Sequence, residues 1–247
     1  MNSKNIEIPI ESTHRVIRYT LFSSDSIYKD ALEQAPILAE QLNDYDPSGN
    51  KRTPEVKETV AFSGYIAEAI VIEEINKQLK QLIQNDHLKD IIEAHPVSAN
   101  TIEKNKDSFD QIDIQVTNKS TGNYKTIEVR SSNIYKVKDK DNEVYNQDQS
   151  LIGSYSTKNK AGEIKKDFYV TLFFRHSQDT LTYIKKNNYG LTVDIAGAAS
   201  RELLEVIGTQ SNLKQNGANY LVIKPIIKSN SIYDIVSEIY NCLKSNK

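Results

Sequence analysis

Two short segments that alternate apolar and polar residues flank a single turn in the middle of the chain, and this pair constrains the fold most. The first runs from Ile112 to Val116, and the second from Tyr124 to Arg130. Alternation with a period of two is typical of half-buried β-strands. The residues between them, Lys119 to Asn123, are polar or glycine and predict a turn. The sequence therefore predicts a β-hairpin here.

Three charged residues occupy special positions in this hairpin. Asp113 stands at the head of the first strand, while Glu128 and Arg130 are two residues apart and share one face of the second. If the strands pair, two carboxylates and a guanidinium converge at one end of a small sheet. Carboxylate oxygens suit Mg²⁺, and a metal beside a fixed cation can act on a phosphate. The alternative is an ordinary hairpin with one solvated, charged face.

A long amphipathic helix is predicted upstream, from Thr59 to about Gln84. Its apolar stripe consists of Ile72, Ile75, Leu79 and Leu82. Counting back four residues from Ile72 reaches Glu68, which should point at the sheet, while Glu73 and Glu74 should point elsewhere. A carboxylate that faces a core is costly unless it is paired or binds a metal. The alternative is a glutamate favoured by the dipole near the helix N-terminus.

The remaining periodic segments predict an α/β fold with a mixed β-sheet flanked by helices. Strands are expected at 167–175, 191–197 and 220–225, and helices at 26–42, at 200–206 and after the capping residue Ser231. A length of 247 residues suits one domain. We expect residues 1–58 to form a helical N-terminal extension and residues 59–247 to form the core, with a polar insertion at about 133–166.

Asp113 together with Glu128-Val129-Arg130 resembles the motif of the PD-(D/E)XK nuclease superfamily. This resemblance implies a restriction-endonuclease-like fold. Two residues depart from the pattern, because Ile112 precedes Asp113 where the superfamily has proline, and Arg130 stands where it usually has lysine. A guanidinium stays protonated, so Arg130 can clamp a phosphate or a water but cannot act as a base.

The resemblance also implies roles for the site residues. Gly64 to Glu68 has the Gly-x-x-x-Glu form by which such nucleases often bring a helix carboxylate to the metal. Asp113, Glu128 and Glu68 are then expected to hold Mg²⁺, and Arg130 to hold the phosphate or the nucleophile. Asp110 is the reserve candidate for the strand aspartate.

Polar residues near these strands are candidate DNA contacts, since hydroxyls, amides and ammonium groups bind phosphates and base edges. The candidates are Ser131, Ser132, Asn133, Lys136, Lys138, Lys158, Lys160, Lys51 and Arg52. The insertion also holds acidic residues, so an ordinary solvated loop is the alternative. A net charge of −2 argues against a surface that is basic throughout, but a nuclease needs only a local positive patch.

Composition excludes several other classes of function. The single cysteine, Cys242, forbids an internal disulfide and is expected to be buried, and the four histidines lack metal-ligand spacing. No glycine-rich nucleotide-binding loop follows a strand, which argues against an ATP-driven enzyme. No apolar run suits a membrane span or a secretory signal, so we expect a cytoplasmic protein.

These observations together predict a Mg²⁺-dependent endonuclease that cuts double-stranded DNA at a specific sequence, as a type II restriction enzyme does. A homodimer would address both strands of a palindrome, and a cognate methyltransferase is the expected genetic partner. One alternative is a repair or defence nuclease of the same superfamily that recognises structure or modification. The other is a noncatalytic DNA-binding protein with this fold, which the arginine at position 130 favours.

Overall fold

Strands and helices account for most of the chain. The computed structural model describes residues 4–10, 14–46, 49–86, 91–97, 113–134, 145, 149–155, 165–212 and 220–244. The strands are β1 (Lys4–Pro9), β2 (Arg15–Leu21), β3 (Ile92–Pro96), β4 (Ile114–Asn118), β5 (Tyr124–Asn133), β6 (Leu151–Tyr155), β7 (Phe168–Phe174), β8 (Leu191–Ser200), β9 (Thr209–Ser211) and β10 (Tyr220–Ile223). The helices are α1 (Ser26–Gln41), α2 (Pro54–Asn85), α5 (Gln178–Asn187), α6 (Arg201–Ile207), the 3-10 turn η3 (Ile226–Lys228) and α7 (Ile232–Leu243).

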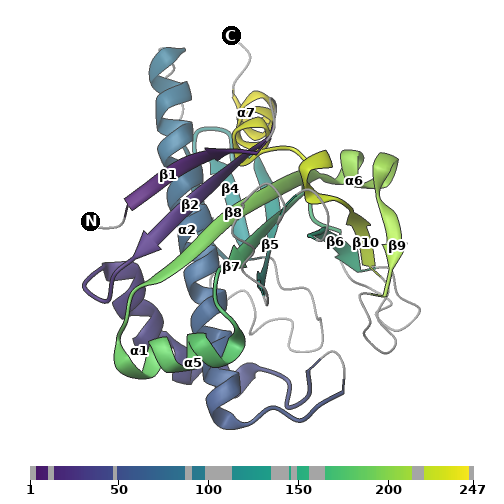
Figure 1. Ribbon diagram of the computed structural model, residues 1–247. Coiled ribbons are helices and arrows are strands. Elements are labelled where there is room, and N and C mark those ends of the chain that lie inside the picture. The colour runs from purple at the N-terminus through teal and green to yellow at the C-terminus, as the bar shows by residue number, and fades with distance from the viewer. Residues whose placement is uncertain are drawn as a thin grey trace.

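A seven-stranded mixed sheet forms the centre of the molecule (Figure 1). Its strand order is β1-β2-β8-β7-β5-β4-β3. Strands β5 and β7 run parallel, and the other neighbouring pairs are antiparallel. A smaller sheet has the order β6-β10-β9. This arrangement agrees with the predicted class, an α/β fold in which helices flank a mixed sheet.

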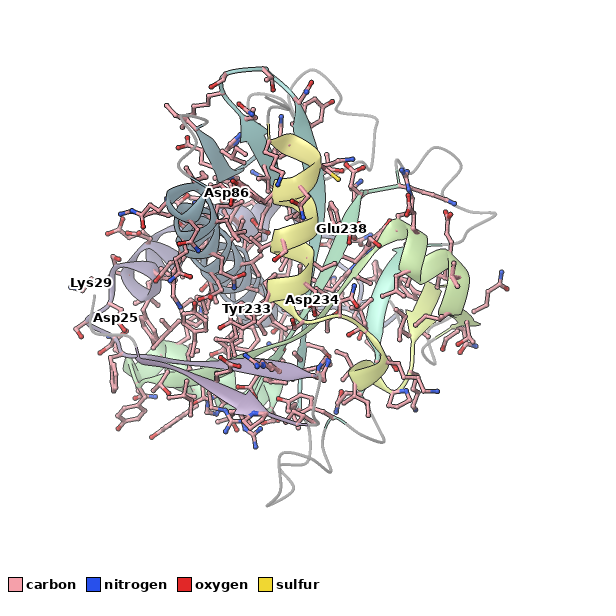
Figure 2. All side chains as sticks on the ribbon, turned by 90° about the horizontal axis from the view of Figure 1, so that it is seen from above. Asp25, Lys29, Asp86, Tyr233, Asp234 and Glu238 are labelled. Carbon is pink, nitrogen blue, oxygen red and sulfur yellow. The ribbon has the colours of Figure 1, made fainter. Side chains whose placement is uncertain are left out.

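The large sheet is covered on both faces. One hydrophobic cluster packs α1, α2, α5 and α7 against one face, and it contains Phe62, Ile127 and Ile235. A second cluster packs the small sheet, α6 and η3 against the other face, with Tyr169 and Leu204 among its members. Figure 2, seen from above, shows α7 in yellow through the middle of the view, with Tyr233, Asp234 and Glu238 along it. Burying apolar area on both faces is the main stabilising contribution to such a layered fold.

The predicted hairpin is present as β4 and β5, which are paired antiparallel. Asn118 closes the turn, because its Oδ1 accepts a hydrogen bond from the backbone N–H of Ser120 at 2.8 Å. Gly122 adopts a φ of 77°, a left-handed conformation that glycine enters without steric cost. Asp113 precedes β4 directly, so it stands at the head of that strand as expected.

The other predicted elements are also confirmed, with small shifts of their ends. The helix predicted from Thr59 begins earlier, at Pro54, because Thr53 caps it by accepting a hydrogen bond from Val56 N at 3.3 Å. Ser231 caps α7 as predicted, and it forms a reciprocal capping box with Asp234. Among the described residues, no helix has the length and apolar character needed to cross a membrane.

The N-terminal segment differs from the expected helical extension. The predicted helix is present as α1, but β1 and β2 precede it and join the large sheet. Strand β2 pairs with β8 along Ile17 to Leu21, and Tyr19 and Leu21 are buried. The prediction missed these strands because their polar residues, such as Arg15 and Arg18, obscure the apolar period. The segment therefore belongs to the core of the fold.

Two further expectations are corrected. The insertion at about 133–166 is not only a polar loop, because β6 lies within it and Tyr145 and Leu151 are fully buried. Cys242 is exposed, although it was expected to be buried. It follows the buried Tyr240 by two residues on α7, which turns it about 200° away around the helix. His14 is buried, and its ring nitrogens Nε2 and Nδ1 lie 2.8 Å and 3.3 Å from the carbonyl oxygens of Ala196 and Ser229, which gives it a structural role.

Candidate active site

Asp113 and Glu128 lie next to each other at the end of the hairpin. The β4–β5 ladder ends at the pair of Ile114 with Ile127, and Asp113 and Glu128 are the residues that follow this pair on the two segments. Directly opposed residues in an antiparallel pair place their side chains on the same face, close together. The Oδ2 atom of Asp113 accepts a hydrogen bond from the backbone N–H of Val129 at 2.7 Å, which fixes its carboxyl group against β5. The two predicted carboxylates are therefore neighbours.

Arg130 lies beside Glu128, as the two-residue spacing predicted. Its guanidinium forms an ion pair with the Glu128 carboxylate. The guanidinium also lies over the ring of Tyr220 on β10, with 5.5 Å between its central carbon and the ring centroid. A cation at this distance from an aromatic face is attracted to it. The ion pair with Glu128 and the contact with Tyr220 thus hold Arg130 between the large sheet and the small sheet.

Glu68 approaches Asp113 from the α2 side of the sheet. Burial, reinforced by the nearby negative charge of Asp113, raises the pKa of Glu68 to about 8. Burial also raises the pKa of Asp113 to about 7, and the Glu128 carboxylate adds to this effect. The Val129 hydrogen bond and the charges of Arg130 and Lys166 act in the opposite direction. The four predicted catalytic residues therefore share one electrostatic cluster.

Lys166 belongs to this cluster although the sequence analysis assigned it only to the polar insertion. Its side chain is 1% exposed, and its positive charge lowers the pKa of Asp113. A fully buried lysine is rare unless a partner compensates its charge. The sequence held one weak sign that Lys166 is buried. Lys166 stands two residues before β7, a strand that is apolar nearly throughout, and a solvated lysine is uncommon there.

The predicted DNA contacts on β5 lie beyond the carboxylates along the same strand. Ser131 is exposed, and Ser132 and Asn133 are partly exposed. The Asn133 Nδ2 atom donates a hydrogen bond to Gln178 Oε1 at 3.0 Å, at the start of α5. These side chains are available to a ligand that lies along β5, but Asn133 already has a partner within the chain.

The other predicted DNA contacts are not brought to the cluster. Lys51 and Arg52 belong to the loop before α2, and the Arg52 guanidinium donates to the carbonyl of Asn43 at 3.0 Å. That contact closes the loop on itself and gives Arg52 a structural role. The four remaining lysines and the reserve aspartate lie outside the described residues; they are Lys136, Lys138, Lys158, Lys160 and Asp110.

The expectation that Glu74 points away from the core is wrong. Glu74 is fully buried and accepts hydrogen bonds from Tyr19 Oη at 2.5 Å and from Gln78 Nε2 at 2.8 Å. Helix α2 packs against both the sheet and α1, so its buried surface is wider than one stripe. The Lys77 ammonium group, 3.2 Å from Glu74 Oε2, and the hydroxyl of Tyr19 on β2 together compensate the buried carboxylate. The pattern of a single helix cannot reveal the partner on β2.

Asp113 and Glu128 offer carboxylate oxygens, the type of ligand that a hard cation such as Mg²⁺ prefers. Among the residues described, no three histidine, cysteine, aspartate or glutamate side chains make a group that could hold a metal ion. Mg²⁺ does not need such a cage, because it commonly binds one or two carboxylates, several waters and the phosphates of its substrate. Asp113 with Glu128, supported by Glu68, meets that requirement in ligand type and number.

Comparisons with known proteins found a relative of similar length. The chain is 28% identical over 254 residues to an uncharacterized protein of Methanocaldococcus jannaschii, in a match that covers 92% of this chain and 87% of that protein. The match therefore spans most of the length of both proteins. No protein-family profile matches the chain. No solved structure matches it either.

Proposed function

We propose that this protein is a Mg²⁺-dependent nuclease that hydrolyses phosphodiester bonds in double-stranded DNA, of the PD-(D/E)XK type. One observation carries the proposal, namely that the Asp113 carboxyl is bonded to the β5 backbone at Val129, next to Glu128, with Arg130 ion-paired to Glu128. The order of elements from α2 through β3, β4 and β5 to β7 also supports it, since it resembles the core of that superfamily.

Each residue has a distinct task in this proposal. Asp113 and Glu128 would ligate the metal, and Glu68 would support it directly or through a water. A bound Mg²⁺ supplies Lewis acidity, which lowers the pKa of a bound water and neutralises charge on the phosphate. Arg130 contributes a fixed positive charge toward the phosphate, and its contacts with Glu128 and Tyr220 hold it in place before substrate arrives.

The more specific form of the proposal is a cytoplasmic type II restriction endonuclease. Ser131, Ser132 and Asn133 continue from the carboxylates along β5, where hydroxyl and amide groups can contact a duplex. A homodimer would present two such sites to the two strands, and a cognate methyltransferase would protect the host DNA. A structure-specific or modification-specific nuclease remains the second candidate, because the same carboxylates would serve it.

The first experiment tests both forms at once. Purified protein is incubated with unmethylated phage DNA in Mg²⁺, with parallel incubations in Ca²⁺ and in chelator. Discrete fragments that appear only with Mg²⁺ support a sequence-specific endonuclease. A smear, or nicks at branched or methylated substrates only, supports the second candidate. Intact DNA with every substrate contradicts the nuclease proposal and favours a noncatalytic DNA-binding protein.

Substitutions of the two carboxylates test the site itself. We expect Asp113→Asn and Glu128→Gln each to reduce the rate of cleavage by roughly a hundredfold to a thousandfold, a loss typical of removing one group that stabilises the transition state. Glu93→Gln is the matched control, because Glu93 is a partly exposed carboxylate on β3 that pairs with Lys119. Full Mg²⁺-dependent cleavage by Glu128→Gln contradicts the assignment.

A further inference from the structure

The position of Glu128 depends on how β5 is held beside its two neighbouring strands. The β4–β5 ladder ends at the pair of Ile114 with Ile127, one residue before Glu128. The β5–β7 ladder begins at Ile127, and its second pair joins Glu128 to Tyr169. Glu128 therefore lies where the pairing of β5 passes from β4 to β7. The start of the β5–β7 ladder fixes its backbone.

This start of the ladder has no turn to hold it. Strands β5 and β7 run parallel, and a long connection separates the end of β5 at Asn133 from the start of β7 at Phe168. Parallel strands cannot be joined by a tight turn, and their pairing is slightly less stable per residue than antiparallel pairing. A contact made just before the first pair therefore has a strong influence on the register of the two strands.

Thr126 and Asp167 make such a contact, since they are the residues that precede the first pair on the two segments. The Oδ2 atom of Asp167 accepts hydrogen bonds from Thr126 N at 3.0 Å and from Thr126 Oγ1 at 2.9 Å. In return, Thr126 Oγ1 accepts one from Asp167 N at 3.1 Å. Hydrogen bonds to an ionised carboxylate are stronger than neutral ones, and Thr126 is only 8% exposed. The two segments are thus joined by three hydrogen bonds.

Asp167 has further contacts that keep it in place. Its backbone carbonyl accepts a hydrogen bond from Arg201 N at 2.8 Å, at the start of α6. Its Oδ1 atom lies 3.5 Å from Lys125 Nζ on β5. Thr126 stands two residues before Glu128, and residues at this spacing share one face of a strand. Asp167 is therefore a fixed point that holds β5 directly beside the candidate active site.

We infer that Thr126 and Asp167 are positioning residues, which set the register of β5 against β7 and thereby hold the Glu128 carboxylate beside Asp113. The inference rests on the proposed function, because that proposal gives Glu128 its task. It goes further by assigning a role to two residues outside the reacting groups. The Val129 N–H reports on this register, because it donates to Asp113 Oδ2 at 2.7 Å and a displaced β5 would lose that bond.

Cleavage kinetics test the inference through a threonine series. Thr126→Val keeps the shape of the side chain and removes the hydroxyl. We expect kcat to fall by roughly tenfold to a hundredfold, because a small displacement of a catalytic group is costly, while KM for the DNA stays unchanged. Thr126→Ser keeps the hydroxyl and should restore kcat. Thr117→Val is the matched control, because the Thr117 hydroxyl lies 3.1 Å from His95 Nε2 at the turn end of the hairpin. Wild-type kcat in Thr126→Val overturns the inference.

Amide hydrogen exchange, followed by nuclear magnetic resonance on the intact protein without DNA, tests the same inference without cleavage. In Thr126→Val we expect the Val129 amide to exchange faster than in the wild type, while amides of the β2–β8 ladder keep their rates. Thr126→Ser should exchange as the wild type does. Equal acceleration in both parts of the sheet indicates a general loss of stability and overturns the inference. An unchanged rate at Val129 overturns it as well.

The outcomes separate this inference from the proposed function. If Thr126→Val does not fold, as judged by circular dichroism, Asp167→Asn replaces it, because asparagine keeps one acceptor oxygen and loses the charge. Wild-type kcat and wild-type exchange at Val129 in that variant overturn the inference. Faster exchange at Val129 alone, in a protein that cleaves no DNA, supports the positioning contact and contradicts the nuclease proposal. Cleavage that is insensitive to both substitutions keeps the nuclease proposal and removes the role of Thr126 and Asp167.

Discussion

At the scale of single residues, Glu68 should make the stability of the protein depend on pH. Burial and the charge of Asp113 raise its pKa from 4.5 to about 8. Between these values the folded protein keeps a proton that the unfolded chain has lost, so the free energy of unfolding falls as pH rises. The stabilisation is complete below about pH 4.5 and is lost as pH passes 8, at a rate of about 1.4 kcal/mol per pH unit as an upper limit.

Urea unfolding at pH 5, 6, 7 and 8, in the presence of chelator, measures this dependence. The variant Glu68→Gln cannot ionise, so its free energy of unfolding should fall less steeply over the same range. A variant that keeps the full wild-type slope would show that another group causes it. Added Mg²⁺ should restore stability to the wild-type protein at pH 8, because a bound cation favours the ionised carboxylates.

Arg130 should also contribute to stability, since it neutralises a buried carboxylate. Arg130→Met leaves Glu128 without its ion pair at a position that is only 11% exposed, and we expect a loss of about 2 kcal/mol. Arg15→Met is the matched control, because it breaks an exposed ion pair with Glu7 at 2.7 Å. Such surface pairs contribute about 0–1 kcal/mol. Equal losses in the two variants, measured by urea unfolding, would contradict this account.

The sequence identified Glu128 and Arg130 because a period of two fixes which residues of a strand share a face. It identified Glu68 because helical periodicity relates it to Ile72. Lys166 was assigned only to the polar insertion because it lies outside any periodic segment, and its position depends on the contact between Asp167 and Thr126 on another strand. Local spacing therefore predicted the residues of the cluster that lie on a strand or a helix. It did not predict Lys166, whose position depends on a tertiary contact.

At the scale of elements, the same substitution should have opposite effects at two glycines. Gly64 lies inside α2, where a Cβ atom would meet nothing within 4 Å. Gly64→Ala should therefore stabilise the protein by about 0.5–1 kcal/mol, the difference in helix propensity. Gly122 also has open space around it, but its φ is 77°. Gly122→Ala should destabilise the hairpin by about 1–2 kcal/mol.

Thermal or urea unfolding of both variants measures these changes. Because neither glycine is crowded, a change in the free energy of unfolding that has opposite signs at the two positions comes from backbone conformation alone. A destabilised Gly64→Ala variant would indicate that α2 requires glycine for a reason other than space. If Gly64→Ala folds normally yet loses DNA cleavage, the missing Cβ matters for close approach of the substrate to α2.

The helices and strands were predicted well where the sequence showed both a regular apolar period and a residue that marks the end of the element. Ser231 marked the start of α7, and the glycine-containing turn marked the hairpin. The polar edge strand β1 and its neighbour β2 were missed, because strands at an edge carry fewer apolar residues than central ones. The sequence cannot show that β2 pairs with β8, whose paired residues lie at least 170 positions further along the chain.

At the scale of the whole molecule, the N-terminal strands should be indispensable for folding. Strand β2 lies between β1 and β8, so its removal leaves β8 with an unpaired edge. Removal also leaves the buried carboxylate of Glu74 without the Tyr19 hydroxyl. A protein that lacks residues 1–24 should therefore show no cooperative unfolding transition, since losing a strand and exposing its core contacts exceeds the 5–15 kcal/mol that stabilises a typical domain.

A milder change tests the same idea within an intact chain. Tyr19→Phe keeps the buried ring and removes only the hydroxyl, so it should cost about 1–3 kcal/mol, because the buried Glu74 carboxylate loses one of its donors while Gln78 and Lys77 still donate to it. If residues 1–58 were an independent extension, the truncated protein would instead unfold cooperatively at the wild-type midpoint, and Tyr19→Phe would have no effect. Because Glu74 lies on the same helix as Glu68, the Tyr19 contact also ties the N-terminal strands to the element that carries one of the site's carboxylates.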